Sequence, residues 1–315
     1  MPDIQETNMR HVLSLFEMTP EEIRQVLELS SQYKAKLENN DRPALLAGHT
    51  VGLLFEKPSL RTRVSFETLT SQLGGGSLFL GQDVGWGSRE PLCDFIPILT
   101  SYLDLLVIRA KSHAKVEEAV SYSRCPVING LTDVSHPCQA FADLLTVMEL
   151  AGSDFPNSKI TYVGDANNVT YSLALICSKL GVRMSIAAPE GYQFETSFID
   201  KLNEINGNSL ISQTANIEEA VDGANFIYTD VWTSMGQEAE SKQRLKDLAD
   251  YQVNDSIMSQ AAPDAKFLHC LPARRGEEVA SEVIDSDRSA IIQQANNRLH
   301  AQKGLVIWLL EKGKQ

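Results

Sequence analysis

Short apolar runs alternate with longer helical patterns along this 315-residue chain, and that alternation limits the fold more than any other feature. Repeated strand–helix units build parallel sheets whose faces are covered by helices. The sequence therefore predicts an α/β fold of two doubly wound domains, each a mainly parallel sheet covered by helices. Strands are expected at 50–55, 103–108, 127–129, 160–163, 184–187, 210–213, 226–229 and 266–269. Helices are expected from Thr19-Pro20 onward and at 60–73, 116–122, 139–150, 168–180, 196–204 and 217–221.

A turn-rich segment, AGSDFPNS at 151–158, divides the alternating pattern into two series. The length also favours two domains, since one domain typically takes about 150 residues. We therefore expect one domain at 1–150 and a second at 151–287. The last segment, 288–315, is expected to form a helix that packs back on the first domain.

Charge and cysteine content exclude several functional classes. The formal net charge is −13, with 28 Lys and Arg against 41 Asp and Glu, which argues against a nucleic-acid partner. The five cysteines are odd in number and lack a C-x-x-C pair, so neither a disulfide framework nor a zinc ribbon is expected. Free cysteines favour a reducing, cytoplasmic location. We expect no secretory signal and no membrane span, because no long apolar run is present.

The segment FEKPSLRTR at 55–63 lies where a strand ends and a helix begins. Free backbone N–H groups at a helix start bind anions, and Ser59 and Thr62 add hydroxyl groups. Arg61 and Arg63 add guanidinium groups that match phosphate oxygens bidentately. The residue types alone fit equally well a capped helix with two solvated arginines.

The segment HPCQ at 136–139 opens the next long helix, where His136 and Gln139 share one face of the first turn. They could offer an imidazole and an amide to a polar ligand, although a simple cap explains them at least as well. Asp143, one turn further, is expected to orient a neighbour rather than to contact substrate.

Three further motifs follow strands of the second half, namely GDANN at 164–168, DVWTSMG at 230–236 and HCLPA at 269–273. The first replaces the G-x-G-x-x-G of dinucleotide enzymes by amide side chains, which disfavours a dehydrogenase. Asp230 could hold an ammonium group, and Met235 could pack against an aliphatic chain. Cys270 is open to three readings: nucleophile, polar contact or core residue. His269 and the other histidines show no metal-ligand spacing.

Taken together and in this order, the motifs SLRTR, HPCQ, GDANN, DVWTSMG, HCLPA and NRLHAQK (297–303) resemble the transcarbamylase family, and within it the ornithine branch. The resemblance covers nearly the whole chain. It implies transfer of a carbamoyl group from carbamoyl phosphate to the δ-amine of L-ornithine, giving L-citrulline and phosphate, in arginine metabolism. It implies no metal and no organic cofactor. It also implies a homotrimer, or a multiple of one, in which a neighbour's loop completes each site.

The resemblance assigns the site residues in two groups. Those implied to hold carbamoyl phosphate are Ser59, Leu60, Arg61, Thr62, Arg109, His136, Gln139, Cys270, Leu271 and Arg298. Those implied to hold ornithine are Asn168, Asp230, Ser234 and Met235. Arg109, His136 and Cys270 are the expected catalytic residues.

Two positions depart from the family pattern. Leu60 stands where many members have Thr, but this position offers mainly its backbone. In the neighbour loop, Gly85 stands about where ornithine enzymes carry a Gln that reaches the neighbour's phosphate. Arg89 or Gln82 is expected to replace that Gln, with Trp86 at the pocket rim, and water is the alternative. A Trp in this loop also resembles the branch acting on N-acylated ornithine, which remains the alternative acceptor beside other amino acids.

Overall fold

The computed structural model describes residues 9–207, 209–233 and 238–312 of the chain. The chain forms two compact units. Unit 1 combines Met1–Phe141 with Arg298–Gln315, and unit 2 is Ala142–Asn297. Along the chain, the boundaries between the units fall within helix α5 (Pro137–Ala151) and within helix α12 (Ile291–Lys312). The sequence placed these boundaries at 150/151 and 287/288. Helices that continue from one unit into the next show no local break for sequence reasoning to find.

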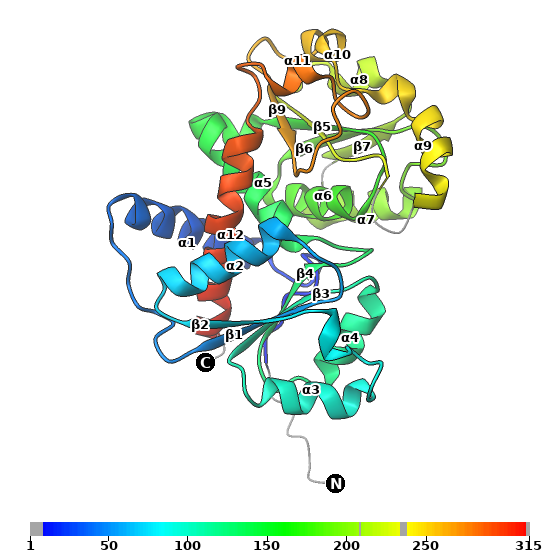
Figure 1. The fold of residues 1–315 in the computed structure, drawn as a ribbon. Coiled ribbons are helices and arrows are strands. Elements are labelled where there is room, and N and C mark those ends of the chain that lie inside the picture. The colour runs from blue at the N-terminus through cyan, green and yellow to red at the C-terminus, as the bar shows by residue number, and fades with distance from the viewer. Residues whose placement is uncertain (1–8, 208, 234–237, 313–315) are drawn as a thin grey trace. The chain divides into compact units, whose positions relative to one another are not determined.

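Unit 1 is built on a parallel sheet of four strands in the order β2-β1-β3-β4 (Figure 1). The strands are β1 (Thr50–Phe55), β2 (Gly76–Leu80), β3 (Leu105–Arg109) and β4 (Val127–Leu131). The helices are α1 (Pro20–Glu38), α2 (Leu60–Gln72), α3 (Leu92–Thr100) and α4 (His113–Ser121), with a short 3-10 turn, η1, at Gln82–Val84. The strand order reverses between β1 and β3, and ligands of such sheets bind at that point, outside the carboxyl ends of the strands.

Unit 2 is built on a parallel sheet of five strands in the order β7-β6-β5-β8-β9 (Figure 1). The strands are β5 (Lys159–Val163), β6 (Arg183–Ala187), β7 (Ile211–Thr214), β8 (Phe226–Thr229) and β9 (Lys266–His269). The helices are α6 (Asn168–Leu180), α7 (Thr196–Asn206), α8 (Ile217–Val221), α9 (Ser241–Asp247), α10 (Asp255–Gln260) and α11 (Ser281–Ile284), with 3-10 turns η2 (Gly152–Asn157), η3 (Glu238–Glu240) and η4 (Ala249–Tyr251). Here the order reverses between β5 and β8. Two helix-covered parallel sheets confirm the predicted fold class.

Short-range sequence patterns such as helix caps predicted several helices and strands at the positions where the structure has them. The Thr19 hydroxyl accepts the backbone N–H of Glu22, and Glu22 returns a bond to the Thr19 N–H, so a capping box starts α1 where the sequence predicted a helix. Two elements of unit 1 were not predicted, the edge strand β2 and helix α3. Strand β2 leaves its side chains half exposed or exposed, so it lacks the continuous buried run that marked the other strands.

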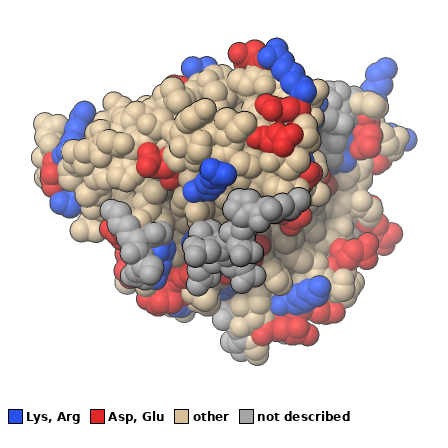
Figure 2. Space-filling view, turned by 90° about the horizontal axis from the view of Figure 1, so that it is seen from below, with Lys and Arg blue, Asp and Glu red and all other residues tan. Residues whose placement is uncertain are grey.

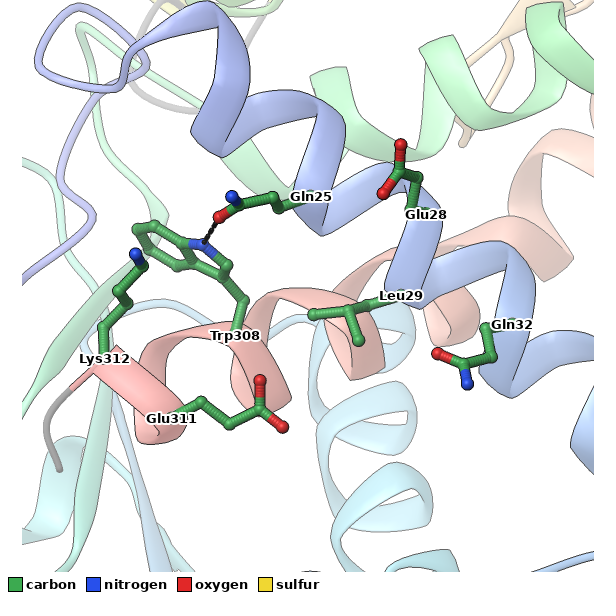
Figure 3. Close-up of a pocket in the computed structure, with 7 residues that line it drawn as sticks. All are labelled: Gln25, Glu28, Leu29, Gln32, Trp308, Glu311 and Lys312. Carbon is green, nitrogen blue, oxygen red and sulfur yellow. Dashed lines mark hydrogen bonds between the residues drawn. The ribbon is translucent and has the colours of Figure 1, made fainter. Parts of the chain in front are cut away.

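The last turns of α12 pack against α1 and α2 within unit 1. A Cβ added to Gly304 would lie 2.6 Å from the Val26 carbonyl oxygen, so only glycine permits this close helix crossing. Lys303 donates to Gln72 at 2.6 Å, and the Trp308 indole N–H donates to Gln25 at 3.1 Å (Figure 3). Glu28 and Glu311 flank the pocket between the two helices, which has a volume of about 320 Å³ (Figure 3). None of the sequence-predicted site residues lines that pocket.

Charged groups of both signs are interspersed on the face of the molecule drawn in Figure 2. Among the described residues, no helix combines the length and the apolar character that a bilayer crossing requires.

A pH-dependent contribution to stability arises at His11. Its Nδ1 accepts the backbone N–H of Val127 at 3.1 Å, and burial together with the charge of Arg10 lowers the pKa of His11 to about 4. The folded chain keeps this ring neutral, whereas the unfolded chain protonates it below its ordinary pKa. Stability is therefore lost as pH falls from about 6.5 towards 4, by up to about 3 kcal/mol.

The expected measurement is urea unfolding between pH 7 and pH 4.5 for the wild type and for His11→Asn. The Asn Oδ1 can accept the same N–H but does not titrate in this range, so the loss of stability on acidification should be smaller in the variant. Equal losses in both proteins would contradict the assignment to His11.

Candidate active site

The N-terminus of α2 forms an anion-binding arrangement at the carboxyl end of β1. Ser59 is the N-cap residue, but its hydroxyl donates to Thr62 Oγ1 at 3.0 Å and makes no capping bond to the helix backbone. The first N–H groups of a helix lack intrahelical acceptors, and these remain open to a ligand. Leu60 is the first residue of α2, and it is 76% exposed.

Arg298 of α12 joins this helix start to helix α5. Its two terminal nitrogens contact different elements, Gln139 Oε1 at 2.5 Å and Thr62 Oγ1 at 3.2 Å. Arg109 ends β3, at a shift of register between Ile108 and Arg109 in the pairing with β4. Irregularities of this kind re-aim side chains beside active sites. Both arginines are buried, so unit 1 holds two guanidinium groups at its switch point.

His136 is neutral in this setting. Burial lowers its pKa well below the ordinary value, and the charges of Arg298 and Arg109 act in the same direction. A neutral imidazole can donate one hydrogen bond to a ligand oxygen, but it adds no positive charge. Cys138 beside it is a thiol, since burial raises its pKa to about 11.

Arg63 is engaged elsewhere and is not part of the anion cradle that the sequence suggested. Its guanidinium lies 3.7 Å from the centre of the Phe79 ring, and its Nε donates to Glu67 at 3.0 Å. Position 63 follows Arg61 by two residues, so the helix turns the two side chains in different directions.

The loop at 81–90 keeps its central tryptophan inside unit 1. Trp86 is buried in an apolar cluster, and Lys115 lies 4.8 Å from the centre of its ring and donates to its carbonyl at 3.1 Å. The expectation of Trp86 at a pocket rim is therefore wrong for this chain. Gly85 has a positive φ of 71°, and a Cβ there would lie 2.8 Å from Cγ of Arg89, which explains why a glutamine is not found at this position.

The two candidates for replacing that glutamine differ in their contacts. Gln82 donates to the Glu56 carbonyl at 2.8 Å and so binds its own unit. Arg89 is exposed, and its side chain lies beside Gly85.

In unit 2, Asp230 directly follows β8 and is held on both carboxylate oxygens. Oδ2 accepts from the Asn167 amide at 3.0 Å, while Oδ1 accepts from the Val231 N–H at 2.8 Å and the Cys270 thiol at 3.0 Å. Asn167 caps α6 through its own Oδ1, which accepts the N–H groups of Val169 and Thr170. Asn168 begins α6 next to this cap. The motifs after β5, β8 and β9 therefore meet around one carboxylate, as switch-point geometry requires.

Cys270 is a thiol rather than a nucleophilic thiolate. Burial raises its pKa well above the ordinary value, and the adjacent charge of Asp230 raises it further. Of the three readings open from the sequence, this state favours the polar contact.

Asp230, His269 and Cys270 also form a cluster of three metal-type ligands, with donor atoms within 4.8 Å of one another among the described residues. Both ring nitrogens of His269 are already hydrogen-bonded, to the Leu271 N–H and to Glu278, which leaves neither one open for a metal ion.

Sequence reasoning missed the contacts that Arg244 makes with Trp232, shortly after β8, and with Asp165. Arg244 of α9 donates to the Trp232 carbonyl at 2.6 Å and pairs with Asp165 of the GDANN motif. Its guanidinium also lies 5.0 Å from the centre of the Tyr192 ring. No local sequence pattern predicts the Arg244–Asp165 pair, because the two residues lie far apart in the sequence. Ser234 and Met235, expected at the ornithine site, lie outside the described residues.

Asp143 behaves as the sequence predicted. It is buried in unit 2, where its two oxygens accept from the Tyr228 hydroxyl at 3.2 Å and the Gln294 amide at 2.7 Å. It therefore orients neighbouring side chains.

Residues 10–149 match the family model described as the carbamoyl-P binding domain of aspartate/ornithine carbamoyltransferase, and residues 156–309 match its Asp/Orn binding domain. The chain is 46% identical over 301 residues to an ornithine carbamoyltransferase of Anoxybacillus flavithermus, covering 95% of this chain and 96% of the relative. It is 46% identical over 308 residues to that of Bacillus subtilis, covering 97% and 95%. The solved ornithine carbamoyltransferase from Pyrococcus furiosus superposes with a TM-score of 0.90 at 42% identity, covering 96% and 97%.

Proposed function

Because the chain belongs to the aspartate/ornithine carbamoyltransferase family, we propose that it transfers the carbamoyl group of carbamoyl phosphate to the δ-amine of L-ornithine. The products are L-citrulline and phosphate. The observation that carries this proposal is the presence, at each sheet's switch point, of the chemistry that one substrate needs. Unit 1 offers buried guanidinium groups for a phosphate, and unit 2 offers a carboxylate for an amino acid's ammonium group.

We assign carbamoyl phosphate to unit 1. The phosphate is held by the first-turn N–H groups of α2, the hydroxyl groups of Ser59 and Thr62, and the guanidinium of Arg61. Arg109, His136 and Gln139 bind the carbamoyl end, with Arg298 fixing Gln139 and Thr62 in place. Cys270 and Leu271 are proposed to line the site.

Negative charge grows on the carbamoyl oxygen as the amine attacks the carbon. Thr62, Arg109 and His136 are the donors assigned to this oxygen. Removing one such preorganised donor typically costs about 3–4 kcal/mol of the barrier. His136 serves as a neutral donor, so it adds no positive charge beside the incoming amine.

The attacking δ-amine must be neutral, yet a free alkylamine of pKa near 10.4 is neutral in only about one molecule in 2,500 at pH 7. Desolvation and the positive charge of Arg109 favour the neutral form. The departing phosphate is itself a base and can take the amine proton, so this chemistry needs no protein base. Asn168, Asp230, Ser234 and Met235 are assigned to hold ornithine, with Asp230 facing its α-ammonium group.

The acceptor is assayed directly by incubating the protein with carbamoyl phosphate and L-ornithine, N-acetylornithine or L-aspartate. Citrulline formation is expected with ornithine alone. The N-acylated alternative loses support on two grounds: the relatives act as ornithine carbamoyltransferases by name, and Trp86 is packed in the core of unit 1. Preferred turnover of an N-acylated ornithine would overturn the proposal.

We also propose that the enzyme is a cytoplasmic homotrimer of arginine metabolism with sites shared between subunits. The five cysteines are free thiols, which suits a reducing compartment. In the shared site, Arg89 replaces the family's loop glutamine and binds the neighbouring subunit's phosphate through a charge-assisted bond. Water in place of a side chain is the alternative.

Mixing two inactive variants under subunit exchange tests the shared site. Arg61→Ala removes a contact within the subunit and Arg89→Ala removes one given to a neighbour, so some mixed trimers regain a complete site and activity returns. Full activity of Arg89→Ala alone would show that Arg89 is not the replacement. If both variants are inactive and proven exchange restores nothing, the site is not shared in this way.

A further inference from the structure

A fully buried pair of side chains, His269 and Glu278, lies next to Cys270 in unit 2. His269 ends β9, and Glu278 lies in the segment after it; both side chains are 0% exposed. Their contact joins His269 Nε2 to Glu278 Oε1 at 3.1 Å. Glu278 is itself anchored, because its carbonyl accepts the Val253 N–H and its Oε1 accepts the Arg274 N–H at 2.5 Å.

The hydrogen bonds determine which ring nitrogen of His269 carries the proton. The backbone N–H of Leu271 lies 2.9 Å from Nδ1 and can only donate, so Nδ1 must accept. A neutral imidazole then carries its proton on Nε2, which donates to Glu278 Oε1. An accepting oxygen at Glu278 therefore selects the tautomer that leaves Nδ1 free to hold Leu271.

Leu271 needs such a contact because of its backbone. Its φ is +60°, a left-handed conformation that a bulky residue rarely adopts and that persists only where surrounding contacts enforce it. Cys270 stands between His269 and Leu271, so the same bond sets the course of the chain through the residue whose thiol contacts Asp230 at 3.0 Å.

We propose that His269 is a positioning residue, held in one tautomer by Glu278, that fixes the Leu271 backbone and thereby aims Cys270 at Asp230. The inference deepens the proposed function and rests on it, since Asp230 is the carboxylate assigned to ornithine. His269 acts through its neighbours and does not contact substrate.

Two matched pairs of variants test the relay. His269→Asn keeps an accepting oxygen near the place of Nδ1, whereas His269→Leu removes it. Glu278→Gln keeps an accepting oxygen for Nε2–H, whereas Glu278→Leu removes it. We expect the two leucine variants to raise the ornithine KM or lower kcat by up to about 100-fold, the effect of a small misplacement. The two conservative variants should recover most of the loss.

Glu277→Leu is the control, because Glu277 is adjacent in sequence but its side chain is partly exposed and pairs with Arg274. It should match the wild type. Folded leucine variants at 269 or 278 with a wild-type ornithine KM, or conservative variants as impaired as the leucine ones, would overturn the proposal.

Nitrogen-15 NMR of wild-type protein labelled in its six histidines provides a readout independent of activity. The His269 signals, identified by their loss in His269→Asn, should report a protonated Nε2 and an unprotonated Nδ1. A protonated Nδ1 refutes the relay even if the leucine variants fail to fold. If instead the tautomer is as expected but the wild type makes no citrulline, the proposed function fails and the relay does not.

Discussion

Replacing Arg298 by glutamine is expected to lower kcat/KM for carbamoyl phosphate by roughly 100-fold, the effect of a small misplacement of the groups that bind the substrate. The guanidinium does two things at once, since one nitrogen contacts Gln139 and the other contacts Thr62. A glutamine side chain is too short to reach both groups and carries no charge. Steady-state kinetics and calorimetry with carbamoyl phosphate measure the loss.

Arg298→Lys separates charge from geometry. Lysine keeps the positive charge but has a single nitrogen, so it should recover only part of the activity. Arg24→Gln serves as the control, because this α1 arginine is exposed and lies 3.9 Å from Glu21. Unchanged carbamoyl phosphate affinity in Arg298→Gln would show that Arg298 does not support the carbamoyl phosphate site.

Asp230→Asn is expected to raise the ornithine KM by roughly 30-fold or more, because truncating a buried charge partner typically costs about 2–5 kcal/mol. The loss has a second source. Both Asp230 oxygens accept hydrogen bonds, so an Asn at this position must turn its NH₂ group towards one of the donors. Asn167 cannot rotate to compensate, since its Oδ1 already caps α6.

Carbamoyl phosphate binding decides whether the Asp230 assignment is correct. Calorimetry should show it nearly intact in Asp230→Asn, because unit 1 supplies the phosphate contacts. Asp264→Asn, an exposed position before β9, is the matched control and should leave both substrates unaffected. If Asp230→Asn abolished carbamoyl phosphate binding, the division of the two substrates between the units would be wrong.

Features that depend on neighbouring residues were predictable from the sequence alone. The capping box at Thr19 started α1 as expected, and buried apolar runs located β1, β5 and β8. The motifs after β5, β8 and β9 lie together in unit 2, because the strands of one parallel sheet present their carboxyl ends at one edge. Strand period and helix caps act over a few residues, so one sequence is enough to reveal them.

Features that depend on partners distant in sequence were decided only by the tertiary structure. The neutral state of His136 comes from burial and from Arg109 and Arg298, which belong to other elements. The burial of Trp86 depends on an apolar cluster shared with α3 and α4.

The same holds for the pairs that support the site. Arg244 finds Asp165, and Glu278 selects the proton position on His269, only once the sheet of unit 2 has brought their segments together. A sequence shows which groups can donate, accept or carry charge. Burial and the distances between those groups determine which of them ionise and which proton each one holds.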